Sequence, residues 1–325
     1  MRTRRPTDPG MHPRGHAPAA QDTSAMHGAP DLAFARRLLP GPTHVIGWGG
    51  RPRAVVPAGA RAARVRAVAA IPAFARAARL ARTLEALRLG VAPGRATHPA
   101  RAADEEPDAG PLAELLAAPP WPDAHPVAVW LGTPHPARHV LVPFADPDGH
   151  PVGVAKIATG PRAAAGVARE ADALTDPHVA AWTPRLDGRT PVAGRPTLWL
   201  AHVPGRPPSR GSDAIRRALA DLSPAPDAAA SGLLDRAWVR ASLRAADLPV
   251  APFLAALPGA HPHVRMHGDL APWNVRVDGP RTTFLDWEES RPDGLLGVDA
   301  AHARLAEKLQ LDRASPARAV AHAAD

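Results

Sequence analysis

The sequence predicts an α+β fold with two lobes, one built on an antiparallel sheet and the other mainly helical. The β-rich runs at 125–132, 137–144 and 151–158 are joined by turns of Gly, Pro and Asp, which predicts consecutive antiparallel strands. A helical pattern at 162–175 and one more strand at 195–206 follow. Because strands and helices do not alternate, the order differs from that of a parallel βαβ sheet. Further helical patterns lie at 213–222, 232–248 and 249–257.

The length of 325 residues is sufficient for two domains. Ahead of the sheet lobe, the runs at 43–50 and 52–57 are candidate short strands, and 71–91 has helical periodicity. No motif in this part of the chain indicates a chemical role. We therefore expect a disordered tail at 1–30, an N-terminal accessory region of unknown role at 31–120, a sheet lobe at 121–205 and a helical lobe at 206–325.

Composition argues against several classes of function. The chain has no cysteine, which excludes disulfides, thiolate metal sites and cysteine nucleophiles. Its net charge of +8 comes from arginines scattered among alanines, without the aromatic residues on which single-stranded bases stack. The N-terminus lacks the apolar stretch of a signal peptide, and no apolar run is long enough to cross a membrane. We expect a cytoplasmic monomer or homodimer with no nucleic-acid or membrane partner.

A lysine inside an apolar strand is the first candidate site residue. All but two of the 39 basic residues are arginine, yet Lys156 interrupts the apolar run 151–158. A buried ammonium must be paired or used, and Glu170 follows on the predicted helix. A strand lysine held by a helix glutamate is the pair that protein kinases direct at the phosphates of ATP. The alternative is a lysine at a strand edge that faces solvent.

The second candidate is the segment MHGDLAPWNVRVDGPRTTFLDWEE at 266–289, which contains the single asparagine of the chain. Asn274 lies five residues after Asp269, the spacing at which kinases place a catalytic base and a Mg²⁺ ligand. Two short strands joined by an Asp-Gly turn then return the chain to Asp286, a second hard oxygen ligand. A loop capped by its own side chains is the alternative, but the joint pattern with Lys156 favours a metal site.

These motifs resemble the aminoglycoside phosphotransferase and choline kinase-like superfamily, over about 125–310. The resemblance implies a bilobal protein kinase-like fold with an antiparallel-sheet N-lobe, a mainly helical C-lobe and, here, an N-terminal extension. It also implies ATP and Mg²⁺ as cofactors and transfer of the γ-phosphate to a small-molecule hydroxyl. The implied roles are a catalytic base (Asp269) braced by His267, a phosphate clamp (Lys156, Glu170), a nucleotide loop (Gly132), adenine contacts (Ala201, Val203) and metal ligands (Asn274, Asp286, Glu288).

The acceptor stays open at this point: an amino sugar, a sugar, an amino alcohol or an antibiotic. The loop around Gly132 has one glycine where the family often has more, which favours the alternative of a non-catalytic, kinase-like nucleotide-binding module. The intact set of Lys156, Asp269, Asn274 and Asp286 favours the enzyme. Asp299 matches the acidic residue that anchors the catalytic loop in the family, and it is also a candidate N-cap for the helix that follows.

Overall fold

The computed structural model describes only part of the chain, and the account below concerns that part. The predicted tail and the predicted helices at 71–91 and 249–257 lie outside the described residues. The described residues are 31–48, 51–58, 65, 68, 110–132, 135, 137–209, 211–221, 229–247, 259–295 and 297–324.

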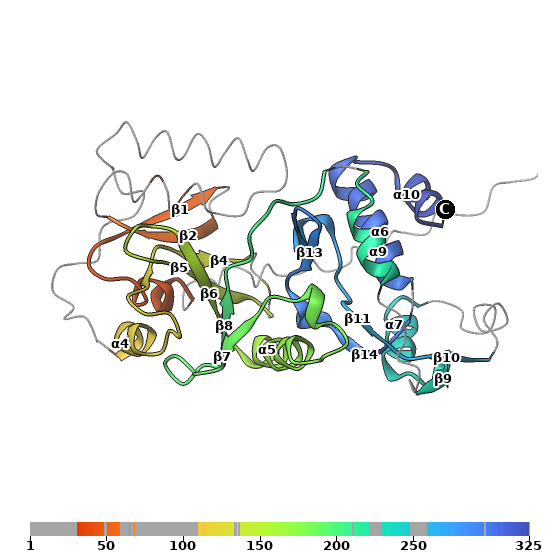
Figure 1. The fold of residues 1–325 in the computed structure, drawn as a ribbon, viewed down its shortest axis with the longest axis horizontal. Helices are drawn as coiled ribbons and strands as arrows, with labels where there is room; N and C mark the ends of the chain where they lie inside the picture. Colours follow the sequence, from red (N-terminus) through yellow and green to blue (C-terminus); the bar gives the residue numbers. More distant parts are fainter. Residues whose placement is uncertain are drawn as a thin grey trace, which may run out of the picture.

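The smaller lobe is an eight-stranded sheet whose neighbouring strands are antiparallel, with the order β1-β2-β4-β5-β6-β8-β7 and β3 added on β5 (Figure 1). The predicted meander is present as β4, β5 and β6, in which each strand pairs antiparallel with the next. The strands are β1 Thr43–Trp48, β2 Arg51–Pro57, β3 His125–Pro126, β4 Val129–Leu131, β5 His139–Ala145, β6 Pro151–Ala158, β7 Leu186–Gly188 and β8 Thr197–Ala201.

The accessory region predicted at 31–120 contributes to this sheet. Its two candidate strands are β1 and β2, and β2 pairs with β4 through Val55 and Val129. A helical turn at 31–36 begins at Asp31, which forms an ion pair with the buried Arg138 just before β5. The helix α4 (Gly110–Ala117) buries Leu115 in the same core. The described part of this region thus extends and covers the sheet.

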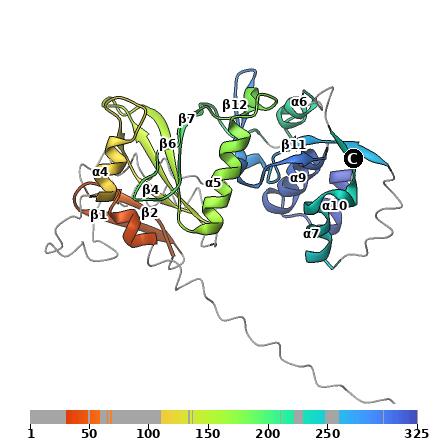
Figure 2. The same cartoon turned by 90° about the horizontal axis from the view of Figure 1, so that it is seen from below.

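The alternation of side chains along β6 decides which of its residues face the second lobe. Ala155 and Ile157 point into a core shared with β2, β4 and β5, whereas Ala158 points to a core shared with the helix α5 (Pro161–Leu174). Lys156 is in phase with Ala158 and is therefore carried on the α5 face. In both Figures 1 and 2, α5 lies between the sheet and the larger lobe.

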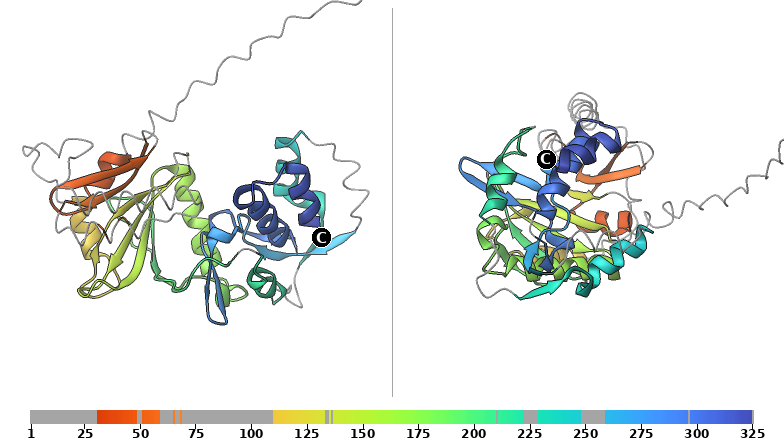
Figure 3. Two further views of the ribbon diagram at one scale, coloured as in Figure 1. Left: turned by 90° about the horizontal axis from the view of Figure 1, so that it is seen from above. Right: turned by 90° about the vertical axis from the view of Figure 1, so that its right-hand side faces the viewer.

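The larger lobe is mainly helical, and three short two-stranded ladders complete it (Figure 3). The hairpin with the predicted Asp-Gly turn is formed by β12 and β13. This layout confirms the predicted α+β class. No helix of the described residues is long and apolar enough to cross a membrane. The elements are α6 Ala214–Ala220, β9 Ala230–Gly232, α7 Ala237–Ala245, β10 Ala260–Pro262, β11 Val264–Met266, β12 Val275–Asp278, β13 Arg281–Phe284, β14 Arg291–Gly294, α9 Val298–Ala306, a π-helical turn Glu307–Leu311 and α10 Pro316–Ala324.

The two lobes share one hydrophobic core. Val167 and Leu174 of α5 belong to the same buried cluster as Leu270, Phe284 and Trp287 of the larger lobe. Burial of apolar surface stabilises by roughly 25 cal/mol per Å², so this shared core holds α5 against the segment that follows β13. The consequence is a fixed position for every polar side chain that α5 and this segment present to one another.

Candidate active site

The buried ammonium of Lys156 is the centre of a cluster of charges at the junction of the lobes. Its Nζ lies 2.7 Å from Glu170 Oε2 on α5 and 3.1 Å from Glu288 Oε2, and it also donates to Asp286 Oδ1. Lys156 and Glu170 are 5% and 0% exposed, so the solvent-facing alternative for the lysine is excluded. Three carboxylates around one ammonium leave excess negative charge, which favours a further cation.

The pKa values of these groups reflect burial opposed by pairing. Burial acts to lower the pKa of Lys156, but the charges of Asp286, Glu170 and Glu288 outweigh it and hold the pKa well above its usual value. Burial raises the pKa of Glu170 in spite of the neighbouring ammonium. Burial also acts to raise the pKa of Glu288, but hydrogen bonding to His139 and the charge of Lys156 lower it to about 2. Lys156 and Glu288 are therefore charged at neutral pH.

Asp286 reaches this cluster through an unusual backbone conformation. Its φ of 68° and ψ of 62° are in the left-handed region, which costs a non-glycine residue roughly 1 kcal/mol or more. Asp286 is the N-cap of the short helical turn Trp287–Glu289, two residues after the end of β13. The amide of Trp287 then donates to Glu170 Oε1 at 3.3 Å, so one glutamate holds both the lysine and this turn. Such strain at a half-exposed carboxylate is typical of functional sites.

His139 is a member of the cluster that the sequence analysis missed. It begins β5 and is 8% exposed. Its Nε2 lies 3.1 Å from the carbonyl oxygen of Ala163, and its Nδ1 lies 3.0 Å from Glu288 Oε2. Both partners are acceptors, so both ring nitrogens must carry hydrogen to satisfy both contacts. A histidine at a strand start has no distinctive sequence signal, because its partners are distant in sequence.

The loop at 267–274, called the catalytic loop below, is anchored by Asp299 in the first turn of α9. Its carboxylate accepts hydrogen bonds from the amides of His267 (2.7 Å) and Gly268 (3.0 Å). Gly297 is the N-cap of α9, so Asp299 anchors the loop and does not cap the helix. The ring of the buried His267 bonds the carbonyl oxygen of Leu285 at 2.8 Å, which ties the loop to the residue before Asp286. The bracing role that the resemblance implied for His267 stays a prediction, and this hydrogen bond is the contact it requires.

Gly268 is required by this arrangement, and a matched glycine provides a control. Gly268 has φ +85°, and a Cβ there would lie 2.3 Å from the carbonyl oxygen of Glu289. Gly149 has φ +87° but open space around the corresponding position. We expect Gly268→Ala to lower the free energy of unfolding by about 3 kcal/mol or more, and Gly149→Ala by about 1 kcal/mol. Denaturant unfolding of both variants measures this; equal losses would contradict the close backbone approach.

Asp269 and Asn274 are in direct contact. The amide nitrogen of Asn274 donates to the backbone carbonyl of Asp269 at 3.0 Å and lies 3.5 Å from its Oδ2. The side-chain carbonyl oxygen of Asn274 is thereby directed away from Asp269, as a metal ligand requires. After β13 the chain comes back beside Asn274, where the backbone amide of Leu285 donates to the backbone carbonyl oxygen of Asn274 at 2.7 Å. Burial raises the pKa of Asp269, although its side chain remains 49% exposed.

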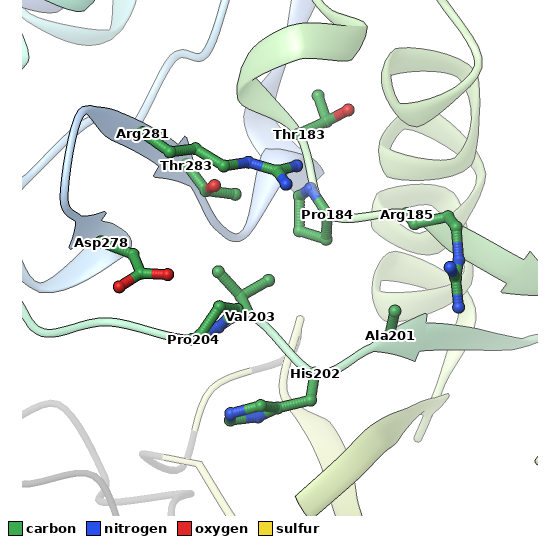
Figure 4. Close-up of a pocket in the computed structure, with 10 residues that line it drawn as sticks. All are labelled: Thr183, Pro184, Arg185, Ala201, His202, Val203, Pro204, Asp278, Arg281 and Thr283. Carbon is green, nitrogen blue, oxygen red and sulfur yellow. The ribbon is translucent and has the colours of Figure 1, made fainter.

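The segment after β8 crosses from the sheet lobe to the helical lobe beside a pocket of about 200 Å³. Figure 4 shows this segment with Val203 on the side of Arg281 and His202 on the other side. The bridge between Arg206 and Val277 then attaches the segment to β12. The lining residues are Thr183, Pro184, Arg185, Ala201, His202, Val203, Pro204, Asp278, Arg281 and Thr283.

The structure brings most, but not all, of the predicted site residues into contact. One set of side chains surrounds Lys156, and a second set belongs to the catalytic loop. Leu285, next to Asp286, links the two sets through its hydrogen bonds to His267 and Asn274. Ala201 and Val203 line the pocket of the lobe crossing, and Gly132 follows β4, with the side chain of Arg138 3.4 Å from where its Cβ would be. The adenine contacts of Ala201 and Val203 and the phosphate contact of Gly132 stay predictions. The set around Lys156 is Glu170, Asp286 and Glu288, and that of the loop is His267, Asp269 and Asn274.

Comparison with known proteins decides the family of this segment. Residues 154–303, from β6 to α9, match the model of the phosphotransferase enzyme family. These residues are a phosphotransferase-family segment. The match contains Lys156, Glu170 and the loop at 267–274, and it confirms the family resemblance that the motifs indicated.

A solved structure and the curated proteins add little to this assignment. The aminoglycoside phosphotransferase APH(3'')-Id from Streptomyces rimosus is 20% identical, over 57% of this chain and 81% of that chain, with a TM-score of 0.37. At that score the likeness carries no argument. No curated protein matches the chain. The phosphotransferase family as a whole supports an enzyme that transfers phosphate to small molecules.

Proposed function

We propose that the protein is an ATP- and Mg²⁺-dependent phosphotransferase that moves the γ-phosphate to a hydroxyl group of a small molecule. The observation that carries this proposal is the contact of Lys156 with both Glu170 and Asp286. These three side chains come from a strand, a helix and a strained turn far apart in sequence. A lysine held by a helix glutamate beside an accessible carboxylate is the arrangement by which kinases bind a metal–nucleotide.

The donor set fits Mg²⁺. Asp286 is 41% exposed and Asn274 presents an amide oxygen, and hard oxygen ligands of these two kinds are the ones Mg²⁺ prefers. Asp286 and Asn274 would hold the ion, which would supply positive charge to the phosphate groups of the nucleotide. The ammonium of Lys156 would donate hydrogen bonds to the phosphate oxygens, while Glu170 holds the ammonium in position. Glu288 contacts Lys156 and His139, so its predicted metal role requires that it turn from them.

In this proposal Asp269 accepts the proton of the attacking hydroxyl. The acceptor oxygen bonds the γ-phosphorus as the bond from phosphorus to the bridging oxygen of ADP breaks, and the hydroxyl proton passes to the Asp269 carboxylate. Its backbone is fixed by the loop anchors at His267 and Gly268, and its pKa is raised by burial. A base of moderately raised pKa accepts a proton more readily at neutral pH.

Nucleotide-dependent thermal shift tests the proposal. We expect ATP to raise the Tm in the presence of Mg²⁺, because a ligand that binds only the folded state stabilises it by mass action. Asp286→Ala should reduce the shift to that seen with ATP and EDTA. The exposed Asp148, in the turn between β5 and β6, provides the matched control: Asp148→Ala should keep the full shift. A Tm that does not respond to ATP in the wild type would refute the nucleotide site.

The same thermal-shift measurement distinguishes the enzyme from the alternative of a non-catalytic nucleotide-binding module. A nucleotide-binding module would show a shift that ignores both Mg²⁺ and Asp286→Ala, and no product. A screen of amino sugars, sugars, amino alcohols and antibiotics would identify the acceptor. The readouts are ADP release and a mass gain of about 80 Da, which corresponds to one transferred HPO₃ unit.

A further inference from the structure

His302 is the described side chain on α9 that faces the carboxylate of Asp269. Its Nε2 lies 3.9 Å from Asp269 Oδ1, and the two side chains are 38% and 49% exposed. Both side chains are therefore accessible to solvent. No role has so far been assigned to this histidine.

The hydrogen bond on the other side of the ring fixes its tautomer. His302 Nδ1 lies 3.0 Å from the carbonyl oxygen of the buried Leu270. A carbonyl oxygen only accepts, so Nδ1 must carry the hydrogen. In the neutral ring, Nε2 is then a bare acceptor, and it is the atom directed at Asp269.

The two oxygens of Asp269 are in different situations. Oδ2 is on the side of the Asn274 amide, at 3.5 Å. Oδ1 is on the side of His302, at a distance too long for a direct hydrogen bond. Asp269 Oδ1 and the unprotonated Nε2 of His302 are thus two adjacent acceptors. A molecule bound between them satisfies both when it carries two adjacent hydrogen-bond donors.

We propose that His302 is a specificity-determining residue that binds a second hydrogen-bond donor on the phosphoryl acceptor, next to the attacking hydroxyl. The acceptor class is then a vicinal diol or a 1,2-amino alcohol: one hydroxyl donates to Asp269 Oδ1 and the neighbouring hydroxyl or amino group donates to His302 Nε2. An acceptor with a single hydroxyl leaves Nε2 without a partner. This inference rests on the proposed function, because it uses Asp269 as the base.

The test uses three acceptors with one carbon skeleton. Phosphate transfer to trans-cyclohexane-1,2-diol and to trans-2-aminocyclohexanol is compared with transfer to cyclohexanol, by ADP release and product mass, with the full-length protein. We expect kcat/KM to be about tenfold or more higher for the two vicinal acceptors, since a site built to accept a hydrogen bond discriminates against a substrate that lacks the donor. His302→Phe should reduce this ratio to about one.

Two further variants distinguish recognition from a structural effect. His302→Gln can donate to the Leu270 carbonyl and still present an acceptor oxygen, so it should keep most of the discrimination. His150→Phe changes an exposed histidine of the β5–β6 turn and should leave the ratio unchanged. The ¹⁵N shifts of the His302 ring should identify Nδ1 as the nitrogen that carries the hydrogen in the neutral ring, and this readout does not depend on activity.

Each outcome is decisive for one of the two proposals. Equal kcat/KM for all three acceptors, a hydrogen on Nε2 in the resting protein, or full discrimination in His302→Phe would overturn the role of His302. Absence of transfer to both vicinal acceptors while Mg²⁺-ATP still raises the Tm would overturn it as well. Absence of that Tm shift would instead overturn the proposed function.

Discussion

Asp269→Asn should reduce kcat by about 10²–10⁴-fold, the range in which general bases contribute. The amide has nearly the same shape but cannot take the hydroxyl proton. Nucleotide affinity should stay near that of the wild type, because Asp269 belongs to the catalytic loop and is not among the contacts of Lys156. Steady-state ADP release and the Mg²⁺-ATP thermal shift, measured on the same preparation, separate the two effects.

The acid side of the pH profile provides a second readout for this base. Burial raises the pKa of Asp269, so kcat/KM should fall as pH decreases through a value above the ordinary aspartate range. Asp148→Asn, at an exposed turn position, is the control and should show the wild-type profile. Product formation by Asp269→Asn at the normal rate would show that another group takes the proton.

Glu170→Ala should cost about 3 kcal/mol of stability, a large fraction of the total for a protein of ordinary stability. The substitution leaves the ammonium of Lys156 buried with only two of its three carboxylates, and it removes the acceptor of the Trp287 amide. Glu170→Gln retains the shape and that hydrogen bond, so its loss should be smaller. Both variants should lose the Mg²⁺-ATP thermal shift, because Lys156 no longer has a fixed position.

An exposed ion pair provides the matched control for this second prediction. Asp213 lies 3.0 Å from Arg216 at the start of α6, and both side chains are more than half exposed. Asp213→Ala should lower the free energy of unfolding far less than Glu170→Ala does, because solvent screens such exposed pairs. Chemical denaturation of the variants in parallel measures both values. Equal losses for Glu170→Ala and Asp213→Ala would mean that the pair at Lys156 contributes no more than a surface contact.

Much of the fold and site could be predicted because the signals are local. The β-rich runs identified β5 and β6, and the Asp-Gly turn identified the β12–β13 hairpin. Lys156 was conspicuous because it is a charge within an apolar strand, and Asn274 because of its spacing from Asp269. The family match later covered the same motifs.

Contacts between distant segments could not be predicted. Nothing in the runs at 43–57 shows that they pair with β4, since sheet neighbours are chosen by the fit of whole faces. The ion pair of Arg138 with Asp31 and the placement of His139 against Glu288 join segments more than a hundred residues apart. A histidine or an arginine in such a site has the same sequence context as one on the surface.

The sequence by itself determined which residues are the candidates for the phosphate clamp, the base and the metal ligands, because their chemistry requires particular side chains at short, regular spacings. Only the tertiary structure decided that Lys156 meets Asp286 directly, that Asp286 does so from a left-handed backbone conformation, and that His302 faces Asp269. The reason is physical: these relations depend on the packing of α5 and α9 against a shared core, and packing is a property of surfaces brought together from the whole chain.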